Sequence, residues 1–304
     1  MEPSESSAAV AVVAPTPASL NPSVARSYAV CEAIARRHAG NFYPAFRVLP
    51  GAQRRAMCAL YAFLRIADDI SDEPGDAGDK RRQLDQWREG LARALQGDYC
   101  HLIYPALHHT VSVYGVPPHY LGAALDGVAM DLYPATYATF ADLRRYCYHV
   151  ASVVGLACIH IWGFSGERAE EYAENAGIAF QLTNILRDLG EDAARGRVYL
   201  PHEDLDRFGY DPARLQLGDR DDSFRELMRF QIERARGFYE ASWPLLPLLR
   251  PPGRAVFLVM ARTYRSLLDA IEGRDYDVFS SRVRVSRWRK LYLALRALPV
   301  RWGW

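Results

Sequence analysis

From Val24 onward, apolar residues recur every three or four positions, and short breaks containing Gly or Pro separate the segments. That period is typical of amphipathic α-helices, and no segment alternates between apolar and polar residues as a half-buried strand does. The sequence therefore predicts an all-α fold. We expect helices over residues 24–38, 51–72, 80–96, 102–114, 118–130, 139–163, 166–192, 221–243, 253–272 and 284–297.

The helical region is expected to form a single domain. A chain of 304 residues can bury a large core, none of the breaks is long enough for a domain linker, and no unit repeats along the chain. The first residues carry acids where a signal peptide needs positive charge, and Pro15 and Pro17 interrupt their apolar run. We therefore expect a disordered leader over residues 1–23 and one domain over residues 24–304.

Charge and cysteine usage narrow the classes of partner and compartment. Lys plus Arg number 37 and Asp plus Glu number 36, so no overall field attracts nucleic acid, and no nucleic-acid partner is expected. The cysteines are single and widely spaced, which indicates a reduced, cytoplasmic chain. We expect all of them to be core residues: Cys31, Cys58, Cys100, Cys147 and Cys158.

The stretch YAFLRIADDISDE, residues 61–73, ends a predicted helix in a cluster of acids. On a helix that advances about 100° per residue, four side chains share a sector of roughly 60°: Tyr61, Arg65, Asp68 and Asp72. Two carboxylates four residues apart repel each other unless a cation lies between them. For this cluster alone a solvated helix end is the commoner explanation, so its meaning depends on a second cluster.

That second cluster occurs in QLTNILRDLGEDAARGRVYLP, residues 181–201. Asn184, Asp188 and Asp192 step by four residues and share one helix face, and Gln181 precedes them. Carboxylate and amide oxygens suit hard cations, and the absence of nearby Cys or paired His argues against zinc. The two acidic faces therefore predict a Mg²⁺ site.

Magnesium is usually held by one or two carboxylates together with phosphate oxygens, so the expected ligand between the two helices carries phosphate. Arg65, Arg187 and Arg197 are candidate partners for that phosphate. Each of them alone is more often a surface ion pair, and it is their co-location that favours the functional interpretation. The rest of the lining is apolar and helical, which suits a hydrocarbon chain attached to a diphosphate.

At these residues the sequence resembles the squalene/phytoene synthase family, whose members join two prenyl diphosphates head to head. The likeness extends from about Tyr28 to Leu298 and includes both acidic motifs, the segment YCYHVASVVG at 146–155 and the segment RVRVSRWRKL at 282–291. It implies an isoprenoid-synthase helical bundle around a central apolar cavity. It also implies prenyl diphosphate substrates and Mg²⁺ as cofactor.

The resemblance implies a role for individual residues. The metal ligands would be Asp68, Asp72, Asn184, Asp188 and Asp192, and the catalytic set would be the four aspartates and Tyr146. The substrate-binding residues would be Phe42, Tyr61, Arg65, Val150, Val154, Gln181, Arg187, Arg197, Tyr199, Tyr264 and Arg282.

One short segment departs from the family pattern. Many relatives carry Ser, then Lys or Arg, then Ser and Phe in the first helix, where these residues contact phosphate. Here HAGNF places Ala39, Gly40 and Asn41 before Phe42, so a cation and two hydroxyls are missing. The role of these three residues, and with it the identity of the substrate, stays open.

The function that we expect is Mg²⁺-dependent condensation of two farnesyl diphosphates to presqualene diphosphate, with squalene as a further product if NADPH supplies a hydride. NADPH use stays open. The alternative is a phytoene synthase that joins two geranylgeranyl diphosphates. A non-catalytic assembly protein would not need the metal ligands, and a terpene cyclase would not need the segments YCYHVASVVG and RVYLP.

Residues 282–304 carry seven basic residues and no acid, interleaved with aromatic and aliphatic residues. Such a stretch can lie on an anionic membrane, which here would be the inner face of the cell membrane. A final helix packed on the domain with its arginines in water explains the pattern equally well. Neither alternative requires a membrane-spanning segment.

Overall fold

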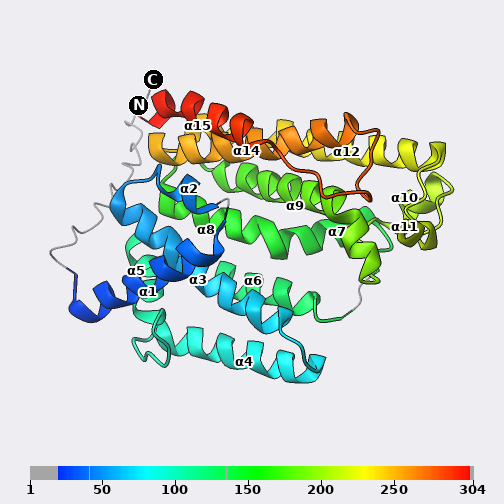
Figure 1. Ribbon diagram of the computed structural model, residues 1–304. Helices are drawn as coiled ribbons and strands as arrows, with labels where there is room; N and C mark the ends of the chain where they lie inside the picture. Colours follow the sequence, from blue (N-terminus) through cyan, green and yellow to red (C-terminus); the bar gives the residue numbers. More distant parts are fainter. Residues whose placement is uncertain (1–19, 41, 134–135, 302–304) are drawn as a thin grey trace, which may run out of the picture.

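The computed structural model describes residues 20–40, 42–133 and 136–301 (Figure 1). Its regular elements are all helical, so the all-α prediction is confirmed; the only paired extended backbone among these residues is an isolated bridge between Phe164 and Leu249. The helices are α1 (Pro22–His38), α2 (Phe42–Phe46), α3 (Gly51–Asp72), α4 (Ala77–Ala94), α5 (Tyr104–Tyr114), α6 (Pro118–Met130), α7 (Phe140–Cys147), the π-helix η2 (Tyr148–Ser152), α8 (Val153–Trp162), α9 (Ala169–Ala194), α10 (His202–Arg207), α11 (Ala213–Leu217), α12 (Asp222–Ser242), α13 (Leu245–Leu248), α14 (Pro251–Glu272) and α15 (Arg287–Arg301).

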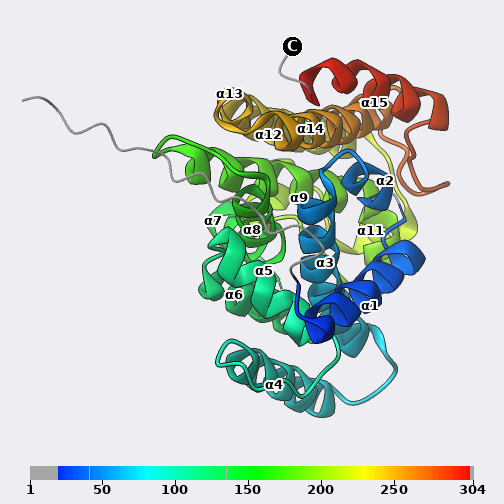
Figure 2. The ribbon, with the colours of Figure 1, turned by 90° about the vertical axis from the view of Figure 1, so that its left-hand side faces the viewer.

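The helices stack in layers (Figures 1 and 2). α14 and α15 form one outer face, α8 and α9 lie beneath them, α3 and α6 follow, and α4 covers the opposite face. The long helix α9 packs against α8, η2, α12 and α14. This central position brings the second acidic motif, near the end of α9, into the interior of the bundle.

The buried apolar residues form two large clusters that meet on α9. The first cluster is built from α1 to α6, α8, the start of α9, α13 and the first half of α14, and the second from α7, the rest of α9, α10 to α12 and the end of α14. Ala176 belongs to the first and Ile178 to the second, with Gly177 between them. α9 therefore contributes to both cores, and so does α14, whose first half belongs to the first cluster and whose end belongs to the second.

The helix expected over residues 139–163 is interrupted by a turn of π-helix, η2, between α7 and α8. Two glycines let neighbouring helices approach this turn. A Cβ on Gly177 of α9 would lie 2.4 Å from the Ser152 Cα, and a Cβ on Gly127 of α6 would lie 2.8 Å from the His149 carbonyl group. The residues of α8 are apolar on nearly every side of the helix, so the change of phase at the π-turn does not show in the sequence, and periodicity predicted one continuous helix.

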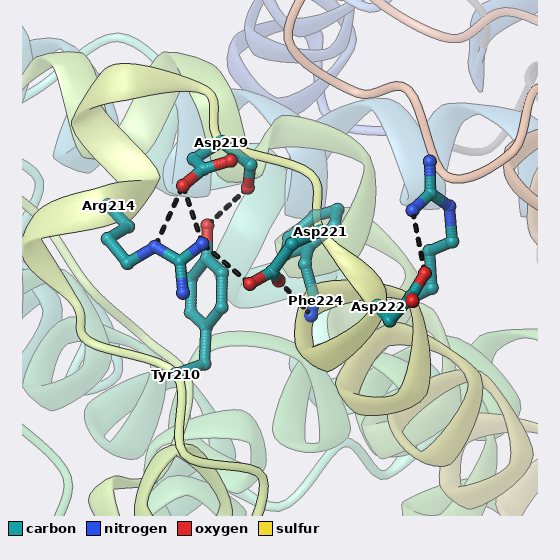
Figure 3. A network of polar contacts seen from close by, with 7 residues as sticks. Tyr210, Arg214, Asp219, Asp221, Asp222 and Phe224 are labelled. Atoms are coloured by element: carbon teal, nitrogen blue, oxygen red, sulfur yellow. Dashed lines mark hydrogen bonds and ion pairs between the residues drawn. The ribbon is translucent and has the colours of Figure 1, made fainter.

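The connection after α9, expected to be a long loop over residues 194–215, contains the short helices α10 and α11. A polar network fixes it to the start of α12 (Figure 3). Arg214 pairs with both Asp219 and Asp221, and the Asp221 Oδ1 accepts from the Phe224 backbone N–H at 3.0 Å, which caps α12. The Tyr210 hydroxyl donates to the Asp219 carbonyl at 2.6 Å. This connection is therefore part of the scaffold.

Candidate active site

The first acidic motif occupies the last turns of α3. Asp68 and Asp72 share one face as expected, whereas Arg65 pairs with Asp69, beside that face. The Asp68 side chain is in contact with solvent, but protein atoms surround it on its other sides. Desolvation by those atoms raises the pKa of Asp68 to about 7; Arg65 works against the shift, and the charge of Asp72 adds to it.

The second acidic motif lies on α9, where Asn184, Asp188 and Asp192 project from one face. Asp188 is engaged by two guanidinium groups: Arg187 donates from Nε to Oδ1 at 2.8 Å, and Arg282 donates from Nη2 to Oδ2 at 2.9 Å. Burial raises the pKa of Asp192 to about 6, and the charge of Asp188 adds to the shift. The structure therefore brings Arg187 and Arg282 together at the second motif.

The neighbouring side chains complete this part of the site. The Asn184 Nδ2 donates to the Gln181 Oε1 at 3.3 Å, while the Asn184 Oδ1 is buried without a hydrogen-bond partner. Tyr264 packs at an angle on Phe180, with ring centroids 5.0 Å apart. Burial raises the pKa of Tyr264, and the Arg187 guanidinium beside it opposes that shift.

Asp131, at the end of α6, is a candidate site residue that was not predicted from the sequence. Its carboxylate accepts hydrogen bonds from the hydroxyls of Tyr146 at 3.0 Å and Tyr199 at 3.1 Å, and its backbone carbonyl accepts from Arg197 Nη2 at 3.3 Å. Burial raises the pKa of Asp131, and the nearby charge of Asp72 adds to the shift.

Asp131 also links the two acidic motifs electrostatically. Its charge contributes to the raised pKa values of both Asp68 on α3 and Asp192 on α9. The only sequence signal for this residue is one acid directly after an apolar helix, in GVAMDLYP at residues 127–134. Its hydrogen-bonding partners are 15 and 68 positions away, so spacing along one helix could not reveal it.

The remaining predicted site residues that the structure describes make apolar or aromatic contacts and no side-chain hydrogen bond with the acidic motifs. Tyr61 contacts Phe46 edge-to-face, with ring centroids 6.4 Å apart. Val150 and Val154 are half-buried on η2 and α8 and pack against different cores. A pocket of about 180 Å³ lined in part by Gln53, near the start of α3, includes none of the predicted site residues.

The segment that departs from the family pattern is only partly described. Asn41 and the side chain of Phe42 lie outside the described residues. Ala39 is buried, and Gly40 has φ of +37°, a backbone conformation that disfavours any side chain at that position. A lysine at position 40 would therefore strain the backbone.

The donor atoms fit a hard cation that approaches together with phosphate. Within the described ranges no three Asp, Glu, His or Cys side chains converge closely enough to hold a metal by themselves. However, the unpartnered Asn184 Oδ1 is an oxygen available to a cation, and Asp68 and Asp192 keep raised pKa values that a cation would lower. A phosphate-bearing ligand would supply the remaining oxygens.

Comparison with known proteins supports the same assignment. The family model described as squalene/phytoene synthase matches residues 35–289. The chain belongs to the squalene/phytoene synthase family. It is 37% identical over 278 residues to a phytoene synthase of Arthrospira platensis, covering 87% of this chain and 90% of the relative. It is also 37% identical over 284 residues to the 15-cis-phytoene synthase of Synechococcus elongatus, covering 88% of this chain and 91% of the relative.

Solved structures of this family share the fold. A dehydrosqualene synthase in complex with a ligand superimposes with a TM-score of 0.84 at 29% identity, covering 92% of this chain and 98% of the other. A squalene synthase from Alicyclobacillus acidocaldarius gives 0.80 at 26% identity, covering 85% of this chain and 98% of the other. The isoprenoid-synthase fold and the expected enzyme class are thereby confirmed: the protein is a prenyltransferase of the squalene/phytoene synthase type that carries out head-to-head prenyl condensation.

Proposed function

We propose that this protein is a phytoene synthase that joins two geranylgeranyl diphosphates. The observation that carries the proposal is its 35–37% identity, over about nine tenths of the chain, to three cyanobacterial enzymes named phytoene synthases. Condensation of two farnesyl diphosphates, the function expected first from the sequence, remains a second candidate. It is favoured by the TM-scores of 0.84 and 0.80 with a dehydrosqualene and a squalene synthase.

The first half of the proposed reaction separates charge. The C–O bond of one substrate breaks, and its electron pair leaves with the diphosphate. The double bond of the second substrate attacks the allylic cation, and loss of a proton to the released diphosphate closes a cyclopropane ring. Arg187 and Arg282, which contact Asp188, and Arg197, which contacts Asp131, would bind the diphosphates and stabilise this charge. Mg²⁺ bound by Asp68, Asp72, Asn184, Asp188 and Asp192 would neutralise charge on the leaving diphosphate.

In the second half the cyclopropyl intermediate loses its own diphosphate and rearranges. The resulting cation can lose a proton to form a central double bond, as phytoene requires, without any reductant. Squalene instead requires a hydride, so NADPH would be needed only for that product. The tyrosines around Asp131 and the half-buried Val150 and Val154 would exclude water from the cation.

Product analysis tests the proposal. The purified full chain is incubated with Mg²⁺ and geranylgeranyl diphosphate or farnesyl diphosphate, with and without NADPH, and the products are identified by mass spectrometry. We expect phytoene from the C20 substrate in the absence of NADPH. Presqualene diphosphate, dehydrosqualene or squalene from the C15 substrate alone would favour the second candidate, and no product from either would refute both.

We also propose that the enzyme is cytoplasmic and that α15 rests on an anionic membrane surface. One face of α15 packs on α14, where Leu293 and Ala297 are buried. The opposite face exposes Trp288, Tyr292 and Leu295, spaced by four and three residues. No described helix combines the length and the apolar character that crossing a bilayer demands. A basic helix with an exposed apolar stripe suits peripheral contact, and a greasy product would benefit from it.

A further inference from the structure

We propose that Asp131 is a positioning residue that fixes the direction of the hydrogen bonds made by Tyr146 and Tyr199 and so presents both phenol oxygens to the reacting cation as acceptors. The inference rests on the proposed function, because it concerns how the same site handles a carbocation. Asp131 is neither a predicted metal ligand nor a predicted substrate contact.

The direction of the hydrogen bonds follows from proton counting. Each phenol has one proton, and an ionised carboxylate has none to give, so both tyrosines must donate to Asp131. Tyr146 lies 3.0 and 3.1 Å from the two carboxylate oxygens, and Tyr199 lies 3.1 Å from Oδ1. With both protons committed, the remaining lone pairs of the two phenol oxygens point away from Asp131.

The surrounding contacts hold this arrangement in place. The rings of Tyr146 and Tyr199 are stacked with centroids 5.3 Å apart, and Tyr137 stacks on Tyr199 at 6.1 Å. Arg197 donates to the Asp131 carbonyl at 3.3 Å. Tyr146 is also 97% buried, since its relative exposure is 3%. Residues from α6, from α7 and from the connection after α9 are therefore locked around one carboxylate, and the phenols are fixed before substrate arrives.

Acceptor-only phenols suit the second half of the reaction. An oxygen lone pair stabilises a nearby positive carbon, whereas an O–H turned toward the site would oppose that charge. Asp131 also lies beside Arg197, a predicted diphosphate-binding residue that donates to its backbone carbonyl at 3.3 Å, so its negative charge is near the expected diphosphate. The carboxylate therefore weakens diphosphate binding in the ground state. This loss of binding energy is offset when the cation forms, because the negative charge then stabilises the positive carbon.

The substitution Asp131→Asn distinguishes the effect of Asp131 on the cation from its effect on diphosphate binding. The amide has the same shape but donates from Nδ2, so one phenol must turn its proton toward the site. We expect kcat to fall by about tenfold or more, as for other fixed hydrogen-bonding groups in active sites, with the cyclopropyl diphosphate accumulating. KM should stay the same or fall, because a negative charge near the diphosphate is removed. Asp126→Asn, at an exposed aspartate on the same helix paired with Arg88, is the matched control and should leave both constants unchanged.

A double-mutant cycle with Tyr146→Phe shows whether Asp131 acts through the tyrosine. We expect Asp131→Asn to cost much less in the Tyr146→Phe background, because the proton that it misdirects is gone. Fully additive losses would overturn the proposal, as would a wild-type kcat in Asp131→Asn. A loss of Mg²⁺ affinity in Asp131→Asn, measured by calorimetry with inorganic diphosphate present, would make Asp131 a metal ligand instead.

A pH titration of the tyrosines, followed by absorbance, tests the hydrogen bonds to Asp131 without measuring enzyme activity. Burial and the neighbouring Asp131 charge raise the pKa of Tyr199 to about 12. In Asp131→Asn we expect more tyrosinate absorbance below about pH 11 than in Asp126→Asn, since the carboxylate no longer opposes ionisation. Identical titrations would overturn the hydrogen-bonding assignment even if the wild-type protein converts no prenyl diphosphate. If Asp131→Asn does not fold, Tyr199→Phe keeps the proposal testable: kcat must fall while Mg²⁺ affinity is retained, and an unchanged kcat overturns it.

Discussion

The Arg282 guanidinium donates to the Asp188 carboxylate at 2.9 Å, although 94 positions separate the two residues in the chain. This contact joins the strap after α14, residues 273–286, to the second acidic motif on α9. Because Arg187 holds the same carboxylate, two cations already occupy the side chain that is predicted to bind Mg²⁺. Metal binding at Asp188 must therefore compete with both arginines.

Replacing Arg282 with Gln should remove one of these competitors. We expect Mg²⁺ to bind the substrate-free protein about tenfold more tightly, equivalent to ~1.4 kcal/mol, and inorganic diphosphate to bind more weakly. Calorimetric titration with each ligand measures both changes. Arg284→Gln, at an exposed position on the same strap, is the control. Weaker Mg²⁺ binding in Arg282→Gln would contradict the competition.

Asp68→Asn and Asp188→Asn should each leave the helical fold intact and reduce turnover by about 10² to 10³, the range seen when a group that stabilises transition-state charge is removed. Each change removes one negative charge from the predicted Mg²⁺ site. Steady-state kinetics at saturating Mg²⁺, with circular dichroism as the check on folding, measures the effect. EDTA should stop the wild-type reaction and added Mg²⁺ should restore it. Wild-type turnover in either variant would remove that residue from the metal site.

The two carboxyls with raised pKa values predict how stability depends on pH. The pKa of Asp68 is raised to about 7 and that of Asp192 to about 6, from an ordinary value of 3.8. The folded state therefore holds more protons than the unfolded state between about pH 4 and pH 7, and these groups lower the free energy of unfolding as the pH rises through that window. Below it both states are protonated, and above it both are ionised.

Because Mg²⁺ is predicted to bind these carboxylates in their ionised form, we expect it to raise the melting temperature more at about pH 8 than at about pH 5.5. Thermal unfolding at the two pH values, with and without Mg²⁺, provides the measurement. Asp68→Asn should reduce the difference between them. An equal Mg²⁺ effect at both values would show that these carboxyls do not bind the cation.

The close approach at the π-turn can be tested by adding one carbon. In Gly177→Ala the new Cβ would lie 2.4 Å from the Ser152 Cα, so we expect a loss of about 1–3 kcal/mol in the free energy of unfolding, as for other overpacked sites. Gly237→Ala on α12 is the matched control, because a Cβ there meets nothing within 4 Å. It should stabilise the protein by about 0.5–1 kcal/mol through helix propensity. Urea unfolding measures the change in the free energy of unfolding for both variants. Equal changes would show that the backbone at the π-turn moves to accommodate the methyl group without loss of stability.

Vesicle binding tests the exposed stripe on α15. Trp288→Ser should lower the partition onto anionic vesicles by about tenfold, since burial of a large aromatic side chain contributes ~1.5–3 kcal/mol. Leu217→Ser removes an equally exposed apolar residue elsewhere and should have no effect. Binding to neutral vesicles should be weaker, and high salt should release the protein. If Trp288→Ser instead dissociates an oligomer without changing vesicle binding, the stripe is an interface between copies of the chain.

The sequence predicted those parts of the fold and site that depend on local periodicity. The shared faces of Asp68 with Asp72 and of Asn184 with Asp188 follow from a period of 3.6 residues, and both pairs lie on helices with the expected bounds to within three residues. Asp131 could not be found in this way, because its partners come from other elements. The η2 turn was missed because the helix that follows it is apolar on nearly all sides, so a change of phase by one residue is not visible in the pattern.

The place of Gly177 between two cores bears on how the protein opens. Ala176 packs into one hydrophobic cluster and Ile178 into the other, so the boundary between them crosses α9 at a residue with no side chain of its own. Amide hydrogen exchange should therefore divide α9 at this point. Its first turns would gain protection together with α3 and α6, and its later turns, which carry Asn184, Asp188 and Asp192, together with α12. The half of α9 that carries the acidic residues would then open together with the second core, while the first core stays folded.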